Sequence, residues 1–76
     1  MSEVNEVLDA RGLHCPLPIL RAKKALKALE SSHILKVMAT DPSTIKDFEA
    51  FCRQTGHELL SSEEVADEFL FLIKKA

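Results

Sequence analysis

One cysteine in the first quarter of the chain has neighbours typical of a nucleophile. Cys15 stands directly before Pro16, and Pro18 follows two residues later. Two prolines so close cannot occupy a helix interior. They suit a helix start, because Pro16 at the first helical position lacks only an N–H that would be unbonded anyway. The spacing predicts Cys15 at the N-cap, where the positive end of the helix dipole favours a thiolate suited to sulfur-transfer or redox chemistry.

The residues on either side of Cys15 complete this predicted site. Because prolines have no N–H, Leu17 and Ile19 offer the backbone donors nearest the sulfur. Arg11 and His14 add positive charge if their loop folds back toward Cys15. The alternative is that Cys15 is only a small apolar loop residue. The predicted helix start and thiolate environment comprise Pro16, Leu17, Pro18, Ile19, Arg11 and His14.

The second cysteine does not form a dithiol pair with the first. Cys52 lies 37 positions further on, shares a helical stripe with Phe48 and Phe51, and is predicted to be an inert core residue. The chain has no Cys-x-x-Cys spacing, which argues against a thioredoxin-like cycle. A lone nucleophilic cysteine fits a residue that carries a group as a single covalent adduct. A second thiol nearby would attack such an adduct and close a disulfide.

Hydrophobic periodicity predicts the elements that position Cys15. Strands are expected over 4–10, 33–39, 57–65 and 68–74, with a helix over 16–30 and another between Asp41-Pro42 and Gly56. The helical stripes consist of Ile19, Ala22, Ala25, Leu26 and Leu29 in the first helix and Ile45, Phe48, Phe51 and Cys52 in the second. The order βαβαββ predicts an α+β two-layer sandwich, with both helices on one face of a mixed four-stranded sheet.

Length and composition bound the class of protein. Seventy-six residues with 46% hydrophobic and 29% charged side chains predict one small soluble domain over 1–76. The longest apolar run, 69–73, is too short to span a membrane. The acidic N-terminus has no apolar stretch, so no signal peptide is expected. With two widely spaced cysteines and no export signal, we expect a reducing cytosol.

Charge is distributed unevenly along the chain. Segment 11–36 holds six basic residues and one acid, a net charge of +5, whereas the remainder holds four basic and eleven acidic residues, a net charge of −7. Two leucines fall off the core stripe among those basic residues, close to Cys15. This pattern favours a partner-docking face, although a solvated helix face is the alternative. The predicted docking residues are Leu17, Leu20, Arg21, Lys23, Lys24, Lys27 and Asp41.

The segment 8–18, followed by a basic helix, resembles the TusA/SirA-like sulfur-carrier family. The family signature is Cys-Pro-x-Pro at the start of the first helix, and the resemblance extends to Asp41-Pro42 and to the segment 51–53. It implies a two-layer βαβαββ fold. It also implies that Cys15 accepts a persulfide sulfur from a donor protein, a cysteine desulfurase or a rhodanese, and passes it to an acceptor protein thiol.

The resemblance also sets expectations for pathway and cofactors. In such families the relay leads to 2-thiouridine in tRNA, to sulfur oxidation or to molybdenum-cofactor enzymes. The carried group is a covalent persulfide on Cys15, so no cofactor and no metal are expected. We expect a monomer that contacts donor and acceptor proteins but neither nucleic acid nor a membrane, and that counts as an enzyme only as a sulfurtransferase within a relay.

Other classes of function fit the sequence less well. The three histidines and two cysteines lack metal-ligand spacing, and adjacent His14 and Cys15 make an awkward pair for a hydrolase. The chain lacks Trp and Tyr and its four Phe fall in predicted core segments, so direct RNA binding is disfavoured. The strongest alternative is a non-catalytic binding module that uses the basic helix, with Cys15 incidental. A second surface is expected where Leu70, Leu72, Ile34 and Met38 point away from the helices.

Overall fold

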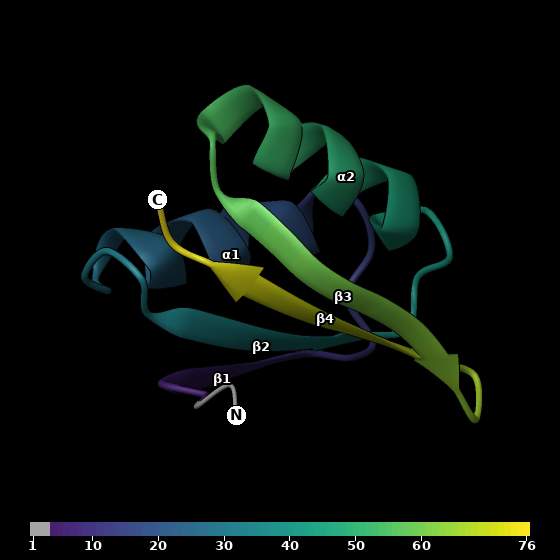
Figure 1. Cartoon of the computed structure of the whole chain (residues 1–76). Helices are drawn as coiled ribbons and strands as arrows, with labels where there is room; N and C mark the ends of the chain where they lie inside the picture. Colours follow the sequence, from purple (N-terminus) through teal and green to yellow (C-terminus); the bar gives the residue numbers. More distant parts are fainter. Residues whose placement is uncertain (1–3) are drawn as a thin grey trace.

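Six elements build the structure, a computed structural model that describes residues 4–76 (Figure 1). Strand β1 spans Glu6–Ala10, helix α1 Leu17–Lys27, strand β2 Ile34–Ala39, helix α2 Thr44–Thr55, strand β3 Glu58–Val65 and strand β4 Glu68–Lys74. The predicted order βαβαββ is confirmed. The first residues of the acidic N-terminus, 1–3, lie outside the described part of the chain.

The four strands form one mixed sheet in the order β1-β2-β4-β3. Strands β1 and β2 are parallel, so their connection must cross the sheet, and α1 supplies that crossover. Strand β4 runs antiparallel to both of its neighbours, β2 and β3. Ala66 and Asp67 join β3 to β4 with positive φ at both residues, as in a tight two-residue hairpin. Both helices cover the same face of the sheet, as predicted (Figure 1).

Alternation along the central strands places the core between the sheet and the helices. Side chains at every second position of β2 and β4 are buried on the helix side, and they meet the apolar stripes of α1 and α2. The main buried members are Leu35, Val37, Ala39, Phe69, Phe71 and Ile73 from the sheet and Ala22, Leu26, Phe48, Phe51 and Cys52 from the helices. The predicted register of β4 is therefore confirmed, with Leu70 and Leu72 half-buried on the opposite face beside Met38 and Lys36.

Both helices begin later than the sequence predicts. Pro16 is the N-cap of α1 and Leu17 its first residue, so Cys15 lies one position before the cap. Ser43 is the N-cap of α2, which places Asp41 two residues outside that helix. Gly56 ends α2 as predicted, with φ +84° and its N–H donated to the Cys52 carbonyl over 2.9 Å. The late start of α1 matters most, because it changes how Cys15 meets the helix end.

Candidate functional site

Cys15 is exposed in the loop that connects β1 to α1. The loop turns at Gly12, whose φ of +79° is a left-handed conformation that glycine adopts without steric cost. The Gly12 N–H donates to the Thr40 Oγ1 over 2.9 Å, and the Leu13 N–H donates to the Ala10 carbonyl over 3.2 Å. These bonds fix the loop to the carboxyl ends of the parallel strands β1 and β2.

Asp41 holds the cysteine loop against the start of α2. Its Oδ2 accepts the Cys15 N–H over 3.0 Å, and its Oδ1 accepts the Ser43 N–H over 3.0 Å. His14 Nδ1 lies 3.8 Å from the same Oδ2. The hydrogen bonds from the Cys15 and Ser43 backbone are the largest causes that lower the pKa of the Asp41 carboxyl below its ordinary value. Asp41 precedes the helix as its sequence position suggests, but Ser43 is the N-cap, and the Asp41 side chain links the cysteine loop to the segment before α2.

The Cys15 thiol is less acidic than the sequence predicts. Its pKa is raised above the ordinary value, first by the Asp47 carboxylate as a potential acceptor for the thiol proton, then by desolvation and by the negative charge of Asp47 and Asp41. The N–H of Leu17, expected to face the sulfur, donates instead to the His14 carbonyl over 2.8 Å. Two nearby carboxylates therefore act against the thiolate that the predicted N-cap position would favour.

Asp47 is the residue of this region that the sequence reasoning missed. It lies in the first turn of α2 and lines a cavity of about 260 Å³ together with Cys15. The remaining walls of this cavity are formed by Pro16, Ile19, Ala50, Phe51 and Gln54. Positions 47, 51 and 54 share one face of α2. An acid at position 47, next to the buried stripe, was the signal in the sequence that could have marked Asp47 as a functional residue. What the sequence could not give was the proximity of that face to Cys15.

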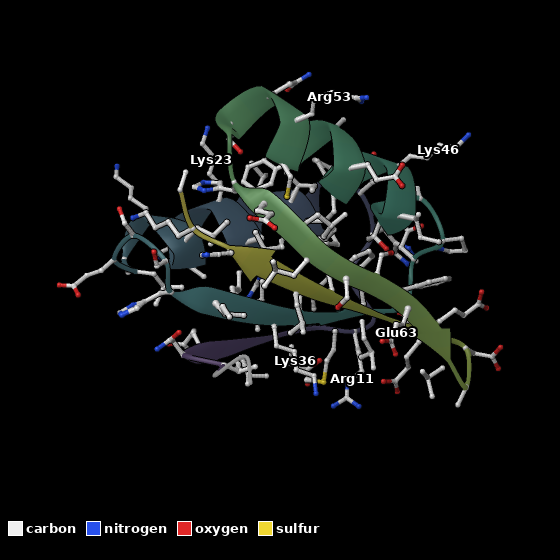
Figure 2. The ribbon with its side chains drawn as sticks, viewed as in Figure 1. Arg11, Lys23, Lys36, Lys46, Arg53 and Glu63 are labelled. Carbon is white, nitrogen blue, oxygen red and sulfur yellow. The ribbon has the colours of Figure 1, made fainter. Side chains whose placement is uncertain are left out.

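Arg11 is not directed toward Cys15 as expected. Its guanidinium binds Asp9, with Nε and Nη2 each 2.9 Å from a carboxylate oxygen, and Nη1 lies 3.4 Å from Glu68. The hydrogen bonds from Arg11 lower the pKa of Asp9 to about 2. Figure 2 shows Arg11 and Lys36 beyond the sheet on the side opposite the helices. Of the two predicted cationic neighbours of Cys15, only His14 lies near the cysteine, beside the Asp41 carboxylate that accepts the Cys15 N–H. The His14 side chain is largely exposed.

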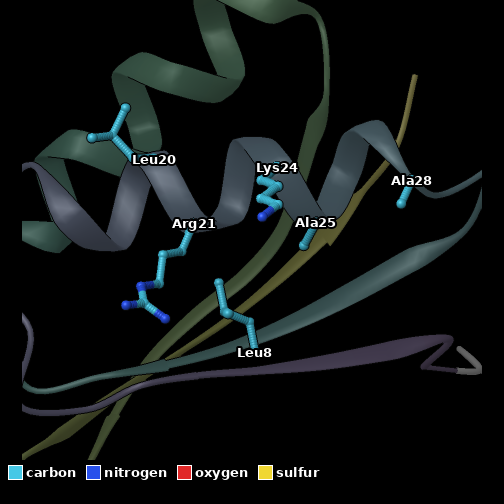
Figure 3. A pocket seen from close by; sticks show the side chains of 6 residues that line it. All are labelled: Leu8, Leu20, Arg21, Lys24, Ala25 and Ala28. Carbon is cyan, nitrogen blue, oxygen red and sulfur yellow. The ribbon is translucent and has the colours of Figure 1, made fainter.

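The outer surface of α1 combines apolar and basic side chains, as the charge pattern predicted. Leu17 and Leu20 are 44% and 53% exposed. The predicted basic residues Arg21, Lys23, Lys24 and Lys27 are all exposed on the same helix. A groove of about 650 Å³ runs between α1 and β1, lined by Leu8, Leu20, Arg21, Lys24, Ala25 and Ala28 (Figure 3). We call this surface, Leu17 and Leu20 with the four basic residues, the α1 face.

Cys52 and the histidines show no second reactive centre in the described chain. Cys52 is buried, and burial raises the pKa of its thiol. Within residues 4–76, no group of three His, Cys, Asp or Glu side chains is placed to hold a metal ion. Over the same residues, no helix has the length and apolar character needed to cross a membrane. Of the two cysteines, Cys15 is therefore the one whose thiol is accessible to a partner.

Comparisons with known proteins agree with the fold and identify the family. Residues 6–75 match the family model described as sulfurtransferase TusA. The sulfur carrier protein TusA of Allochromatium vinosum is 57% identical over 76 residues and covers the whole of both chains. That of Pseudomonas putida is 48% identical over 69 residues, which cover 91% of this chain and 86% of the relative. A SirA-like protein from Desulfitobacterium hafniense has the same fold, with a TM-score of 0.77 at 24% identity and coverage of 93% and 96% of the two chains.

Proposed function

We propose that this chain, which belongs to the TusA family of sulfurtransferases, is a sulfur carrier that holds a persulfide sulfur on Cys15. The observation that carries the proposal is the geometry at Cys15: an exposed thiol on a loop fixed by Asp41, with the other cysteine buried in the core. The high identity to proteins named sulfur carriers over the full chain supports the same assignment. The family resemblance of the Cys-Pro-x-Pro segment led to the same expectation.

The reaction is an exchange between thiols and persulfides. The Cys15 thiol loses its proton and its sulfur attacks the outer sulfur of a donor persulfide. A new S–S bond forms on Cys15, the donor S–S bond breaks, and the donor cysteine leaves as a thiolate that takes up a proton. In the second exchange an acceptor thiolate attacks the outer sulfur, so that an S–S bond forms on the acceptor and the S–S bond on Cys15 breaks. Cys15 leaves as a thiolate that takes up a proton. Neither step needs an oxidant, and both depend on thiolate fraction and access.

The structure supports this chemistry by separating the two thiols. Cys52 is only 5% exposed and lies in the core beside Phe48, whereas Cys15 is exposed. A persulfide on Cys15 therefore meets no internal thiol able to expel its outer sulfur as sulfide. Tight packing of α2 on the sheet keeps Cys52 buried. The carried sulfur is thus available to a partner protein and protected from the chain itself.

The α1 face is the proposed docking surface for the donor and acceptor proteins. Exposed leucines beside a reactive residue, within a basic surround, supply apolar contact and electrostatic steering. Asp41, the remaining predicted docking residue, accepts the Cys15 N–H, and its side chain is 15% exposed. We infer that partners present an acidic rim around their own cysteine. A cysteine desulfurase or a rhodanese is the proposed donor. The acceptor pathways to be tested are tRNA thiolation, sulfur oxidation and molybdenum-cofactor enzymes.

Intact-mass spectrometry tests the carrier function directly. The protein is incubated without reductant, either with a cysteine desulfurase and cysteine or with a rhodanese and thiosulfate. We expect the mass of one added sulfur, removable by dithiothreitol and mapped to Cys15. Cys15→Ser should abolish it, and Cys52→Ala, the matched control, should retain it.

Two outcomes would contradict the proposal. Addition of sulfur at Cys52 would show that the site is wrongly assigned. The absence of added sulfur with both donors would favour a protein-binding module, in which the α1 face contacts a partner and Cys15 is incidental. In that case Cys15→Ser would leave partner binding unchanged, which a pull-down with the partner would show.

A further inference from the structure

A carboxylate oxygen on α2 is buried beside the reactive cysteine without a hydrogen-bond partner. Among the described residues, Oδ2 of Asp47 is shielded from solvent and accepts no hydrogen bond. Buried polar atoms are nearly always paired, because an unpaired one costs its desolvation free energy. An exception at the wall of a cavity shared with a nucleophile indicates a role in the chemistry of that nucleophile.

The cavity contains no cation to neutralise this carboxylate. Its wall consists of Cys15, Asp47, and the apolar or uncharged side chains of Pro16, Ile19, Ala50, Phe51 and Gln54. Outside the wall, Asp41 bonds to the Cys15 backbone and His14 lies beside Asp41. The local field at the sulfur is therefore dominated by negative charge, in agreement with the raised pKa of the Cys15 thiol.

The free and loaded forms of Cys15 differ in charge, so this field acts on them in opposite directions. A protonated thiol is neutral and can donate its S–H toward a carboxylate. A persulfide is more acidic than a thiol, and its outer sulfur is an anion at neutral pH. Placing that anion against the Asp47 wall of this shallow cavity is unfavourable because the two negative charges repel at short range. The solvent side of Cys15 has no such penalty.

We propose that Asp47 is a positioning residue that separates the two states of Cys15: it holds the free thiol protonated in the cavity and turns the anionic persulfide outward for delivery. This inference rests on the proposed carrier function. It means that the free carrier reacts slowly with stray electrophiles and oxidants, because the thiolate is the reactive form. It also means that the loaded sulfur faces the side of Cys15 from which a partner approaches.

Neutralising Asp47 without changing its size tests the inference. In Asp47→Asn we expect the midpoint of the pH dependence of Cys15 alkylation by iodoacetamide to fall by about one pH unit. That shift is about a tenfold rise in alkylation rate below the midpoint. Glu49→Gln is the matched control, because it removes one carboxylate from an exposed position of the same helix. Its midpoint should stay at the wild-type value, and circular dichroism verifies that both variants are folded.

Sulfur loading and discharge provide a second readout. The full chain is loaded with sodium tetrasulfide and then discharged with dithiothreitol, with released sulfide measured over time. Asp47→Asn should load faster, because more thiolate is present, and discharge more slowly, because its persulfide is no longer repelled from the cavity. A purely structural role for Asp47 would not produce this opposite change in the two rates.

Three results would overturn the inference. One is an alkylation midpoint of the wild-type protein below the ordinary thiol pKa of about 8.5, a measurement that requires no variant. Another is an unchanged midpoint in Asp47→Asn, and the third is an equal shift in Glu49→Gln. Failure of the carrier function is distinguishable, because the alkylation midpoints are measured on the free protein. A lowered midpoint in Asp47→Asn with no sulfur ever accepted from a protein donor would refute the carrier function alone.

Discussion

Phe51 belongs both to the hydrophobic core and to the wall of the Cys15 cavity, so one substitution there tests the packing and the site together. Its ring is 8% exposed and packs edge-on against Phe48, with centroids 6.4 Å apart and planes at 88°. The His57 ring lies 5.8 Å away on another side. Its position on α2 therefore couples the fold to the environment of the cysteine.

Phe51→Ala should lower the free energy of unfolding by about 3 kcal/mol, the lower part of the range for Phe→Ala, because the ring is not fully enclosed. A chain of this length has a total stability of roughly 4–11 kcal/mol, so the loss removes a large part of it. The melting temperature should fall by about 12–24 °C. Urea unfolding followed by circular dichroism measures the change, and thermal unfolding gives an independent value.

Phe51→Leu, a milder substitution, tests the effect of this side chain on Cys15 in a protein that stays folded. The smaller side chain opens the cavity to water and reduces the desolvation that raises the pKa of Cys15. The midpoint of Cys15 alkylation should therefore move to lower pH. Phe48→Leu is the matched control, since Phe48 is fully buried against Phe71, with centroids 4.7 Å apart, and does not line the cavity. It should cost stability and leave the midpoint unchanged.

A loss of less than about 1 kcal/mol in Phe51→Ala would contradict the prediction, because it is too small for a buried ring. An equal shift of the alkylation midpoint in Phe48→Leu and Phe51→Leu would also contradict it. The effect on Cys15 would then follow loss of stability in general and not the wall of its cavity.

Three further predictions concern the loops and the α1 face. The pKa of Asp41 is lowered in the folded state, so its contribution to stability is present above its unfolded pKa and lost as the pH falls through its folded pKa. Urea midpoints measured from pH 7 to pH 2 should therefore fall less in Asp41→Ala than in the wild type. Gly56→Ala should cost roughly 1–2 kcal/mol because φ is +84° although the space is open, and an unchanged melting temperature would contradict this. Lys24→Gln should slow loading by a protein donor about twofold to fivefold at low salt and leave tetrasulfide loading unchanged, whereas Lys36→Gln on the opposite face should slow neither.

The fold was predictable because its local signals agree with one another. The stripe of α2 through Phe48, Phe51 and Cys52 and the alternation of β4 each predicted which side chains are buried. Gly56 marked a helix end that requires a left-handed residue. Such patterns are written in neighbouring residues, and packing only has to bring the apolar faces together.

The helix starts were harder to predict because their caps depend on contacts outside the helix. Proline spacing suggested Pro16 as the first residue of α1, but Pro16 is the cap and Leu17 the first residue. Asp41 resembles a cap by its position before Pro42, yet its carboxylate binds the backbone of Cys15, 26 residues away. The tertiary structure decides which groups such a side chain binds, because the sequence alone does not give the distance to a partner far along the chain.

The sequence by itself determined the elements of the fold and singled out Cys15 as the candidate reactive residue, since residue type and spacing are local properties. Only the tertiary structure decided the electrostatic state of Cys15. The packing of α2 against the start of α1 brings Asp47 beside the sulfur, while Arg11 turns to Asp9 and Glu68 on the other side of the sheet. Electrostatic energy depends on distance through space and on burial, and neither is a function of separation along the chain.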